Sequence, residues 1–225
     1  MTVCIVPVKR LSTSLRRLGP LLSQEEKARL SLTMLKDVLW TLQGVQGLDE
    51  LCVVTRDLCA RDAARELGAR VIPEPECAAG EGPAVDYGSR VLAVEGVRQV
   101  LIIPSDLPLV SRTDIQAILK VGLGNPSLVM APAHDGGTNA MLRTPPDVIP
   151  SRFGPDSLSL HIQEARARGV PYRLVQLGSL YRDIDTPEDL SILLTTPNNT
   201  STWKLANEMG LSERLLHMSQ TPEAV

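Results

Sequence analysis

The chain is poor in aromatic residues, which make up 3% of its 225 residues and include one phenylalanine, Phe153. Its apolar fraction is nevertheless 43%, so we expect a sizeable aliphatic core in a single domain. No apolar run is long enough to cross a bilayer, and the sequence does not open with a signal-peptide pattern. We therefore expect a cytoplasmic protein without a membrane partner.

The chain also lacks a basic excess, a metal-binding cysteine pattern and a histidine cluster. Its net charge of −3 argues against a general nucleic-acid binder. Cys4, Cys52, Cys59 and Cys77 show no C-x-x-C spacing, and we expect them to be reduced and structural, as is usual for a cytosolic protein. His161 falls on a helical stretch, where we expect a packed or solvated role rather than catalysis.

Short aliphatic strands alternate with amphipathic helices along most of the chain. The expected strands are 3–8, 50–55, 69–73, 99–104, 127–132, 139–143 and 172–177. The expected helices are 23–43, 57–67, 84–94, 111–121, 156–168 and 186–194. This alternation predicts a mostly parallel sheet with helices on both faces. After residue 194 we expect a linker at 195–202, a helix that can form over 202–217, and a disordered end.

Two acidic segments far apart in the sequence indicate a cation site. Asp106 follows an apolar run and precedes a proline turn, which places it at the carboxyl edge of a buried strand, where open α/β sheets bind ligands. Asp183 and Asp185 flank Ile184, so in an extended segment both carboxylates point to one side. Carboxylates of this kind suit Mg²⁺, which combines protein oxygens with substrate phosphates and waters.

A basic loop follows the first expected strand. Residues 9–20 hold four cations, among them Lys9 and Arg17, and three hydroxyl side chains. Arginine forks and lysine charges bind phosphate, whereas a loop that only contacts solvent is the alternative. Because the loop and Asp106 are expected at the same sheet edge, we favour polyphosphate binding.

Two further segments carry small polar residues. In 132–142, two glycines precede Thr138, a pattern that suits either a ligand loop or a hairpin turn. In 151–157, Gly154 and Ser157 lead into a helix whose first backbone N–H groups can bind an anion. A helix cap with nothing bound is the alternative there.

Taken in order, the segments VPVK, PSDLPL, DGGTNA, RFGPDS and DIDTPEDL resemble the CofC/FbiD family, the guanylyltransferases of deazaflavin coenzyme F-420 biosynthesis. The resemblance covers roughly residues 3–194. It implies a single-domain three-layer α/β sandwich of the nucleotide-diphospho-sugar transferase (GT-A-like) type, with a nucleotidyltransferase domain over 1–194 and a linker, helix and tail over 195–225. Two departures stand out: the first loop reads Leu15-Arg16-Arg17-Leu18 where the family often has K-S-R-L, and residues 80–87 lack an expected asparagine.

The resemblance implies that GTP and a phosphorylated three-carbon acid combine with release of diphosphate. Phosphoenolpyruvate is the acceptor we expect, and 2-phospho-L-lactate and 3-phosphoglycerate are alternatives. The implied roles are Mg²⁺ binding and catalysis for Asp106, Asp183 and Asp185, acceptor binding for Thr138, Gly154 and Ser157, and nucleotide binding for Lys9 and Arg17.

Other interpretations of the sequence stay open. The acceptor can instead be a molybdopterin or a sugar phosphate, and the domain can bind a nucleotide without catalysis. The apolar residues of the C-terminal segment can cover a second subunit, which would make a homodimer. Residues 80–87 leave the base preference open.

Overall fold

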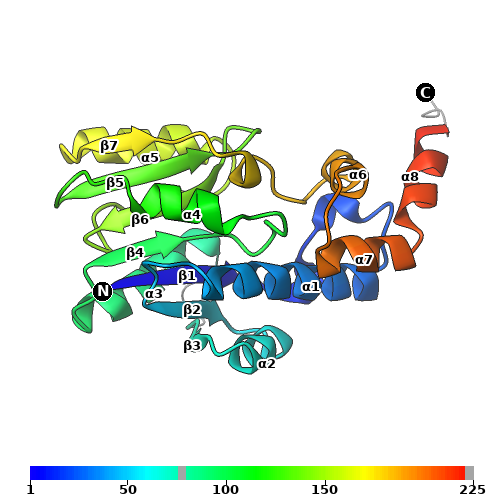
Figure 1. Cartoon of the computed structure of the whole chain (residues 1–225), viewed down its shortest axis with the longest axis horizontal. Helices are drawn as coiled ribbons and strands as arrows, with labels where there is room; N and C mark the ends of the chain where they lie inside the picture. Colours follow the sequence, from blue (N-terminus) through cyan, green and yellow to red (C-terminus); the bar gives the residue numbers. More distant parts are fainter. Residues whose placement is uncertain (76–79, 221–225) are drawn as a thin grey trace.

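The computed structural model describes residues 1–75 and 80–220, which fold around a seven-stranded sheet (Figure 1). The strands are β1 (Thr2–Val8), β2 (Glu50–Thr55), β3 (Arg70–Pro73), β4 (Gln99–Ile102), β5 (Ser127–Pro132), β6 (Thr138–Thr144) and β7 (Tyr172–Leu174). Their order across the sheet is β3-β2-β1-β4-β6-β5-β7. Each strand expected from the sequence is present, and β7 is shorter than the expected 172–177.

Strand β6 runs antiparallel to its neighbours β4 and β5. The pairs β1–β2, β1–β4, β2–β3 and β5–β7 are parallel, so the expected mostly parallel sheet is confirmed. Because β6 is reversed, its first residue, Thr138, lies at the edge where β1 and β4 end. Ligands of open α/β sheets bind at this carboxyl edge.

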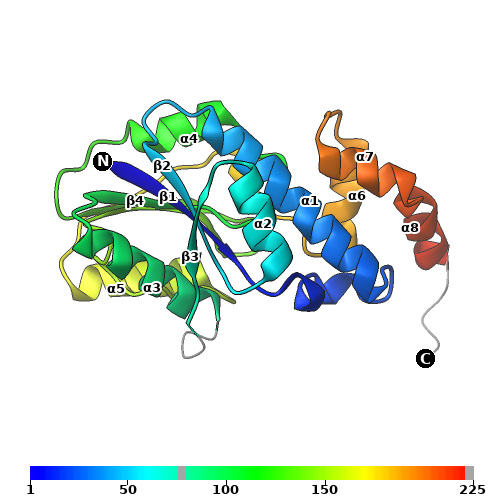
Figure 2. The same ribbon diagram turned by 90° about the horizontal axis from the view of Figure 1, so that it is seen from below.

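Helices cover both faces of the sheet. On one face lie α1 (Gln24–Gln43), α2 (Leu58–Glu66) and α4 (Arg112–Leu119), and on the other lie α3 (Glu81–Val94) and α5 (Ser157–Ala167) (Figure 2). Cys4 of β1 packs into the layer of α1, and the next residue, Ile5, packs into the layer of α3, as the two-residue period of a strand requires. The expected three-layer sandwich is confirmed.

The cysteines differ in their surroundings. Cys4 and Cys52 are buried free thiols, and burial raises the pKa of the Cys52 thiol to about 12. Both therefore act as small core residues. Cys59 is exposed on α2, so the expected structural role is wrong for this residue. Cys77 lies outside the described residues.

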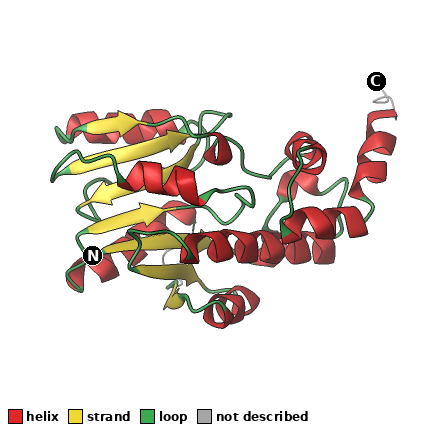
Figure 3. Ribbon diagram, in the orientation of Figure 1, coloured by secondary structure: helices red, strands yellow, loops and turns green. Residues whose placement is uncertain are grey.

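Three helices stand at one end of the sandwich: α6 (Pro187–Thr195), α7 (Ser201–Glu208) and α8 (Leu211–Gln220) (Figure 3). The single helix expected over 202–217 is thus two helices. Gly210 separates them with a φ of +66°, a left-handed conformation that glycine adopts readily and that ends many helices. The expected disordered end falls on 221–225, outside the described residues. Within the part of the chain described, no helix has the length and apolar character of a membrane span.

The last two helices are packed against α1. Leu205 of α7 and Leu211 of α8 share an apolar cluster with Leu30 of α1 and Leu190 of α6. None of the four is more than 6% exposed. The expected linker at 195–202 therefore leads into a segment that completes the covering of α1.

A buried carboxylate secures this contact. Asp37 of α1 accepts hydrogen bonds from the backbone N–H of Ser201 at 3.0 Å and from the backbone N–H and hydroxyl of Thr202 at 2.7 and 2.6 Å. Asp37 is 9% exposed and Thr202 is fully buried. The start of α7 thus obtains the acceptor that its first backbone N–H groups need.

We expect the substitution Asp37→Ala to lower the free energy of unfolding by about 2 kcal/mol or more, because it leaves the two buried donors of Thr202 and the part-buried N–H of Ser201 without an acceptor. Urea unfolding measures this loss. The control is Glu208→Gln, which removes an exposed ion pair with Arg29 (3.9 Å) between the same two helices and should leave the unfolding midpoint unchanged. Equal midpoints for both variants would contradict the role of Asp37.

Candidate functional site

The two acidic segments meet at the carboxyl edge of the sheet. The backbone N–H of Ile184 donates to the carbonyl oxygen of Asp106 over 2.9 Å, and the Ile184 side chain is 1% exposed. Asp183 and Asp185 are thereby held beside the loop that follows β4. Their segment belongs to no strand of the sheet and lies in a loop between the short helix η3 (Gly178–Leu180) and α6.

The start of α6 fixes this acidic loop. Thr186 and Asp189 form a capping box, in which the Asp189 N–H donates to Oγ1 of Thr186 at 3.2 Å and the Thr186 N–H donates to the Asp189 carboxylate at 3.0 Å. Arg182 donates to the same carboxylate over 2.6 Å. Because Asp189 is 1% exposed, one buried carboxylate ties down both ends of the segment 183–185.

Asp106 is half-buried, and its carboxyl oxygen Oδ1 is enclosed among other acidic side chains. Among the described residues, its Oδ1 has no hydrogen-bond partner. Burial raises the pKa of Asp106 well above its ordinary value, and the negative charges of Asp183, Glu81 and Asp185 raise it further. A buried carboxylate in such surroundings is unfavourable unless a cation or a proton joins it.

Basic side chains reach the same acidic groups. Arg17, in the short helix η2 (Arg16–Leu18), lies 3.3 Å from the carboxylate of Asp185. Lys9 lies 3.1 Å from Glu81 in the first turn of α3. Both cations have 62% exposed side chains, so an incoming phosphate can exchange for their present partners. The basic loop therefore adjoins the acidic edge as expected.

Two residues at this edge lie outside the set of site residues expected from the sequence. Glu81 stands in a glycine-rich stretch that carries no recognisable signal, and only the fold brings it to Lys9. Asn139 follows Thr138 in β6 and donates from its Nδ2 to Oδ1 of Asp183 over 3.2 Å. Asn139 thus connects the acidic residues to the residues expected to bind the acceptor.

The donor set at this edge is compatible with a divalent cation. The unpartnered oxygen of Asp106 is an anionic ligand, and Asp183 and Asp185 supply further carboxylate oxygens. In the described residues, however, no group of three or more His, Cys, Asp and Glu side chains is arranged as a ready metal cage. Mg²⁺ does not require one, because it is commonly held by one or two carboxylates together with substrate phosphates and waters.

Two of the expected acceptor residues contact each other directly. The Ser157 hydroxyl donates to Oγ1 of Thr138 over 3.3 Å, and the two residues are 2% and 4% exposed. Gly154 lies on the exposed loop before α5 with a φ of +129° and with no atom within 4 Å of the place where a Cβ would stand. The structure thus brings Thr138 and Ser157 together, while Gly154 borders open space.

The beginning of α5 offers fewer free donors than the sequence suggests. Asp156, at its N-cap, is left-handed and makes no side-chain cap. The N–H of Ser157 bonds to the carbonyl of Gly154 at 3.2 Å, and the N–H of Leu158 bonds to that of Gly136 at 3.2 Å. The residues 133–137 form the turn of the β5–β6 hairpin, as the alternative interpretation of the two glycines proposed. Side-chain hydroxyls rather than the helix terminus are therefore the main donors at this position.

A buried ionic network lies behind the loop. Arg143 of β6 is fully buried and donates to Asp86 of α3 at 3.1 Å and to the Ser151 hydroxyl at 2.7 Å. Asp86 also accepts from the backbone N–H of Ser151 at 3.0 Å. The signal that could have revealed this network is the single charge of Arg143 within the otherwise uncharged strand 138–144.

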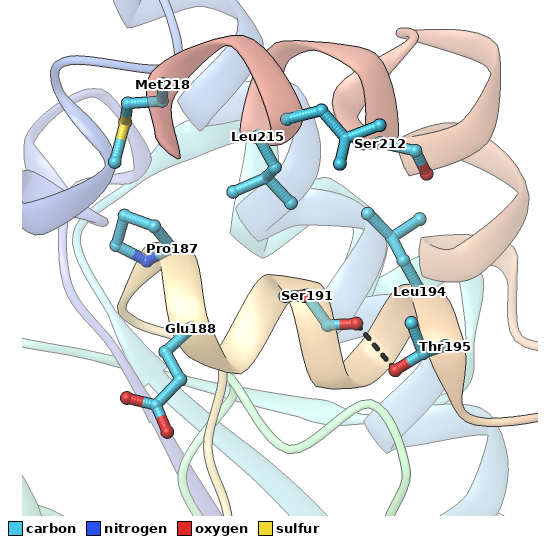
Figure 4. Close-up of a pocket in the computed structure, with 9 residues that line it drawn as sticks. Pro187, Glu188, Ser191, Leu194, Thr195, Ser212, Leu215 and Met218 are labelled. Atoms are coloured by element: carbon cyan, nitrogen blue, oxygen red, sulfur yellow. Dashed lines mark hydrogen bonds between the residues drawn. The ribbon is translucent and has the colours of Figure 1, made fainter. Parts of the chain in front are cut away.

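A separate pocket of about 450 Å³ lies between α6 and α8 (Figure 4). Leu194 of α6 and Leu215 of α8 are among the side chains that line it, and Glu188 is the one ionisable residue of its lining. None of the residues expected to bind metal, nucleotide or acceptor lines this pocket. The pocket is thus separate from the acidic edge of the sheet.

The sequence is similar to those of known guanylyltransferases. The chain is 38% identical over 205 residues to the phosphoenolpyruvate guanylyltransferase of Roseiflexus sp. (strain RS-1), covering 90% of this chain and 89% of that protein. It is 32% identical over 216 residues to the 2-phospho-L-lactate guanylyltransferase of Methanocaldococcus jannaschii, covering 96% and 92% of the two chains. These similarities confirm the expected class of enzyme, a nucleotidyltransferase.

The fold is also found among solved structures. A crystal structure described as a nucleotide-diphospho-sugar transferase from Desulfovibrio desulfuricans G20 superposes with a TM-score of 0.77 at 20% identity, covering 96% of this chain and 97% of that chain. The expected fold type is thereby confirmed. The model of the family described as "Guanylyl transferase CofC like" matches residues 2–225, and the chain therefore belongs to the CofC-like guanylyltransferase family.

Proposed function

We propose that this guanylyltransferase joins GTP to a phosphorylated three-carbon acid, with phosphoenolpyruvate as the preferred acceptor, and that it serves coenzyme F-420 biosynthesis in the cytoplasm. The observation that carries the proposal is the meeting of Asp106, Asp183 and Asp185 with Lys9 and Arg17 at one sheet edge. The choice of acceptor is supported by the activity for which the Roseiflexus relative is named. The pathway and the location are supported by the resemblance of the motifs.

The chemistry requires alignment and charge neutralisation. An oxygen of the acceptor phosphate attacks the α-phosphorus of GTP, a new P–O bond forms, and the bond to the β-phosphate oxygen breaks to release diphosphate. A phosphate monoester has a second pKa of about 6 and is mostly dianionic at neutral pH. No general base is needed, which fits a site built from aspartates, cations and hydroxyls.

The residues divide into three groups by charge. Lys9 and Arg17 would exchange their carboxylate partners for the phosphates of GTP. Asp106, Asp183 and Asp185 would hold Mg²⁺, which when bound offsets the negative charge of the phosphates. Thr138, Ser157 and the loop at Gly154 would contact the acceptor, because they border the acidic edge through Asn139.

The proposal is tested by measuring diphosphate release with each of the four nucleoside triphosphates against phosphoenolpyruvate, 2-phospho-L-lactate and 3-phosphoglycerate. We expect the highest kcat/KM for GTP with phosphoenolpyruvate. Release that depends on GTP but favours another of the three acids would correct the acceptor. No release with any acid would refute the proposed function. A preference for a nucleoside triphosphate other than GTP would indicate that the departure at residues 80–87 has changed the base pocket.

The aspartates give a second prediction. Asp106→Asn, Asp183→Asn and Asp185→Asn should each lower kcat at least about a hundredfold, the loss expected when about 3 kcal/mol of transition-state stabilisation is removed. In metal-free buffer, Asp106→Asn should leave the melting temperature equal or higher, because it removes a buried charge that Asp183 and Glu81 repel. The control is Asp62→Asn on the exposed surface of α2. EDTA should abolish activity and Mg²⁺ restore it; a fully active Asp106→Asn would refute the assignment.

The acceptor residues give a third prediction. Thr138→Val should lower kcat/KM for the acceptor by about tenfold to a hundredfold, since a hydrogen bond to a charged group contributes about 1.5–3 kcal/mol. Ser157→Ala should lower it as well, because it removes the hydroxyl that donates to Oγ1 of Thr138. The KM for GTP should stay close to that of the wild type. The matched control is Ser159→Ala, an exposed serine on the same helix. If the variants weaken GTP binding and spare the acceptor, the two subsites are reversed.

A further inference from the structure

His161 lies in α5 directly behind the acceptor residues, with its side chain fully buried. Its Nε2 is 2.9 Å from the backbone nitrogen of Arg152, and its Nδ1 is 3.1 Å from Oγ1 of Thr138. A backbone N–H can only donate, so Nε2 must be the accepting nitrogen. The neutral ring then carries its proton on Nδ1 and donates it to Thr138.

The surroundings of the ring keep it in this form. Burial, with a further contribution from the positive charge of Arg143, lowers the pKa of His161 to about 4. The ring is therefore neutral at pH 7. The ring of Phe153 meets it edge-on, with centroids 5.2 Å apart, which restricts the orientation of the imidazole.

The hydroxyl of Thr138 has one proton and two acceptor positions. It accepts from Nδ1–H of His161 and from the hydroxyl of Ser157. Both acceptor positions are then filled, and in the described part of the chain Oγ1 has no other hydrogen-bond partner. The remaining function of the group is to donate its own proton, and donors that feed into a hydroxyl strengthen its donation. An anionic oxygen is the natural acceptor for such a group.

The same ring anchors the loop that carries Gly154. His161 holds the backbone N–H of Arg152, and one residue earlier Asp86 holds the backbone N–H of Ser151. The backbone N–H groups of two consecutive residues, Ser151 and Arg152, are therefore held by hydrogen bonds shortly before the loop reaches Gly154. A site that must hold a small anion gains from such fixed geometry.

We propose that His161 is a positioning residue of the acceptor subsite, whose neutral ring orients the Thr138 hydroxyl as a donor and anchors the loop ahead of Gly154. This inference rests on the proposed guanylyl transfer, because the acceptor acid supplies the anionic oxygen. His161 acts through Thr138 and through the Arg152 backbone, and it does not itself contact the substrate.

Two amide variants each remove one of the two hydrogen bonds that the His161 ring makes. In His161→Gln the side-chain oxygen can replace Nε2 and keep the bond to Arg152, but the donor to Thr138 is lost. In His161→Asn the amide nitrogen can replace Nδ1 and keep the donor to Thr138, but the bond to Arg152 is lost. Each variant is compared with the wild type and with Thr138→Val. The double variant Thr138→Val/His161→Gln is measured as well, and Gln163→Ala, at an exposed position on the same helix, is the control.

The readouts are the KM for each substrate, kcat and the melting temperature. For His161→Gln we expect kcat/KM for the acceptor to fall about tenfold or more, with the KM for GTP changed less than about twofold. The double variant should be no worse than Thr138→Val alone, since both substitutions remove the same hydrogen-bond relay. His161→Asn should retain more acceptor efficiency than His161→Gln, and Gln163→Ala should match the wild type.

Each other outcome overturns a defined part of the inference. Multiplying losses in the double variant would show that His161 does not act through Thr138. An equal loss for GTP and acceptor, together with a lower melting temperature, would show a purely structural role. If His161→Asn loses as much as His161→Gln while the wild type is active, orientation of Thr138 is refuted. A wild type that releases no diphosphate with any acid refutes the proposed function itself, which separates that failure from the failure of this inference.

Discussion

Repulsion between carboxylates at the carboxyl edge of the sheet is the constraint around which this end of the molecule is arranged. Asp106, whose carboxyl oxygen Oδ1 is buried, lies near Asp183, Asp185 and Glu81, and charges of one sign in such a place are held together only at a cost in free energy. The backbone bond from Ile184 to Asp106 fixes the two acidic segments despite this repulsion. The exposed cations Lys9 and Arg17 of the first loop partly balance it.

The sheet topology determines which residues can share this edge. The parallel strands β1 and β4 end here, and the reversed β6 begins here. One short hairpin turn therefore brings Thr138 and Asn139 next to the aspartates without a crossover connection. Thr138 at the beginning of β6 and Asp106 after the end of β4 therefore lie at the same edge of the sheet.

Much of this arrangement could be predicted from sequence because its signals are local. The apolar runs before Asp106 and in β1 predict buried strands, and the place of Asp106 at the edge follows from the end of its run. Other features depend on contacts between distant segments. Nothing near Glu81 indicates Lys9, nothing near His161 indicates that both its nitrogens are used, and the division between α7 and α8 depends on the backbone of one glycine. The anchoring of the chain at the end of the expected linker is hidden from the sequence for the same reason, since the partner of Ser201 and Thr202, Asp37, is in α1.

That partner has a consequence for the order of events during synthesis. Asp37 and Thr202 are separated by 165 positions, so the ribosome takes roughly 8–33 s to make the intervening chain at typical elongation rates. During that interval the sheet and its two helical layers can form, but the side of α1 that receives α7 stays uncovered. The nascent chain therefore exposes the apolar surface around Leu30 until its last helices emerge, and exposed apolar surface of this kind is prone to aggregation.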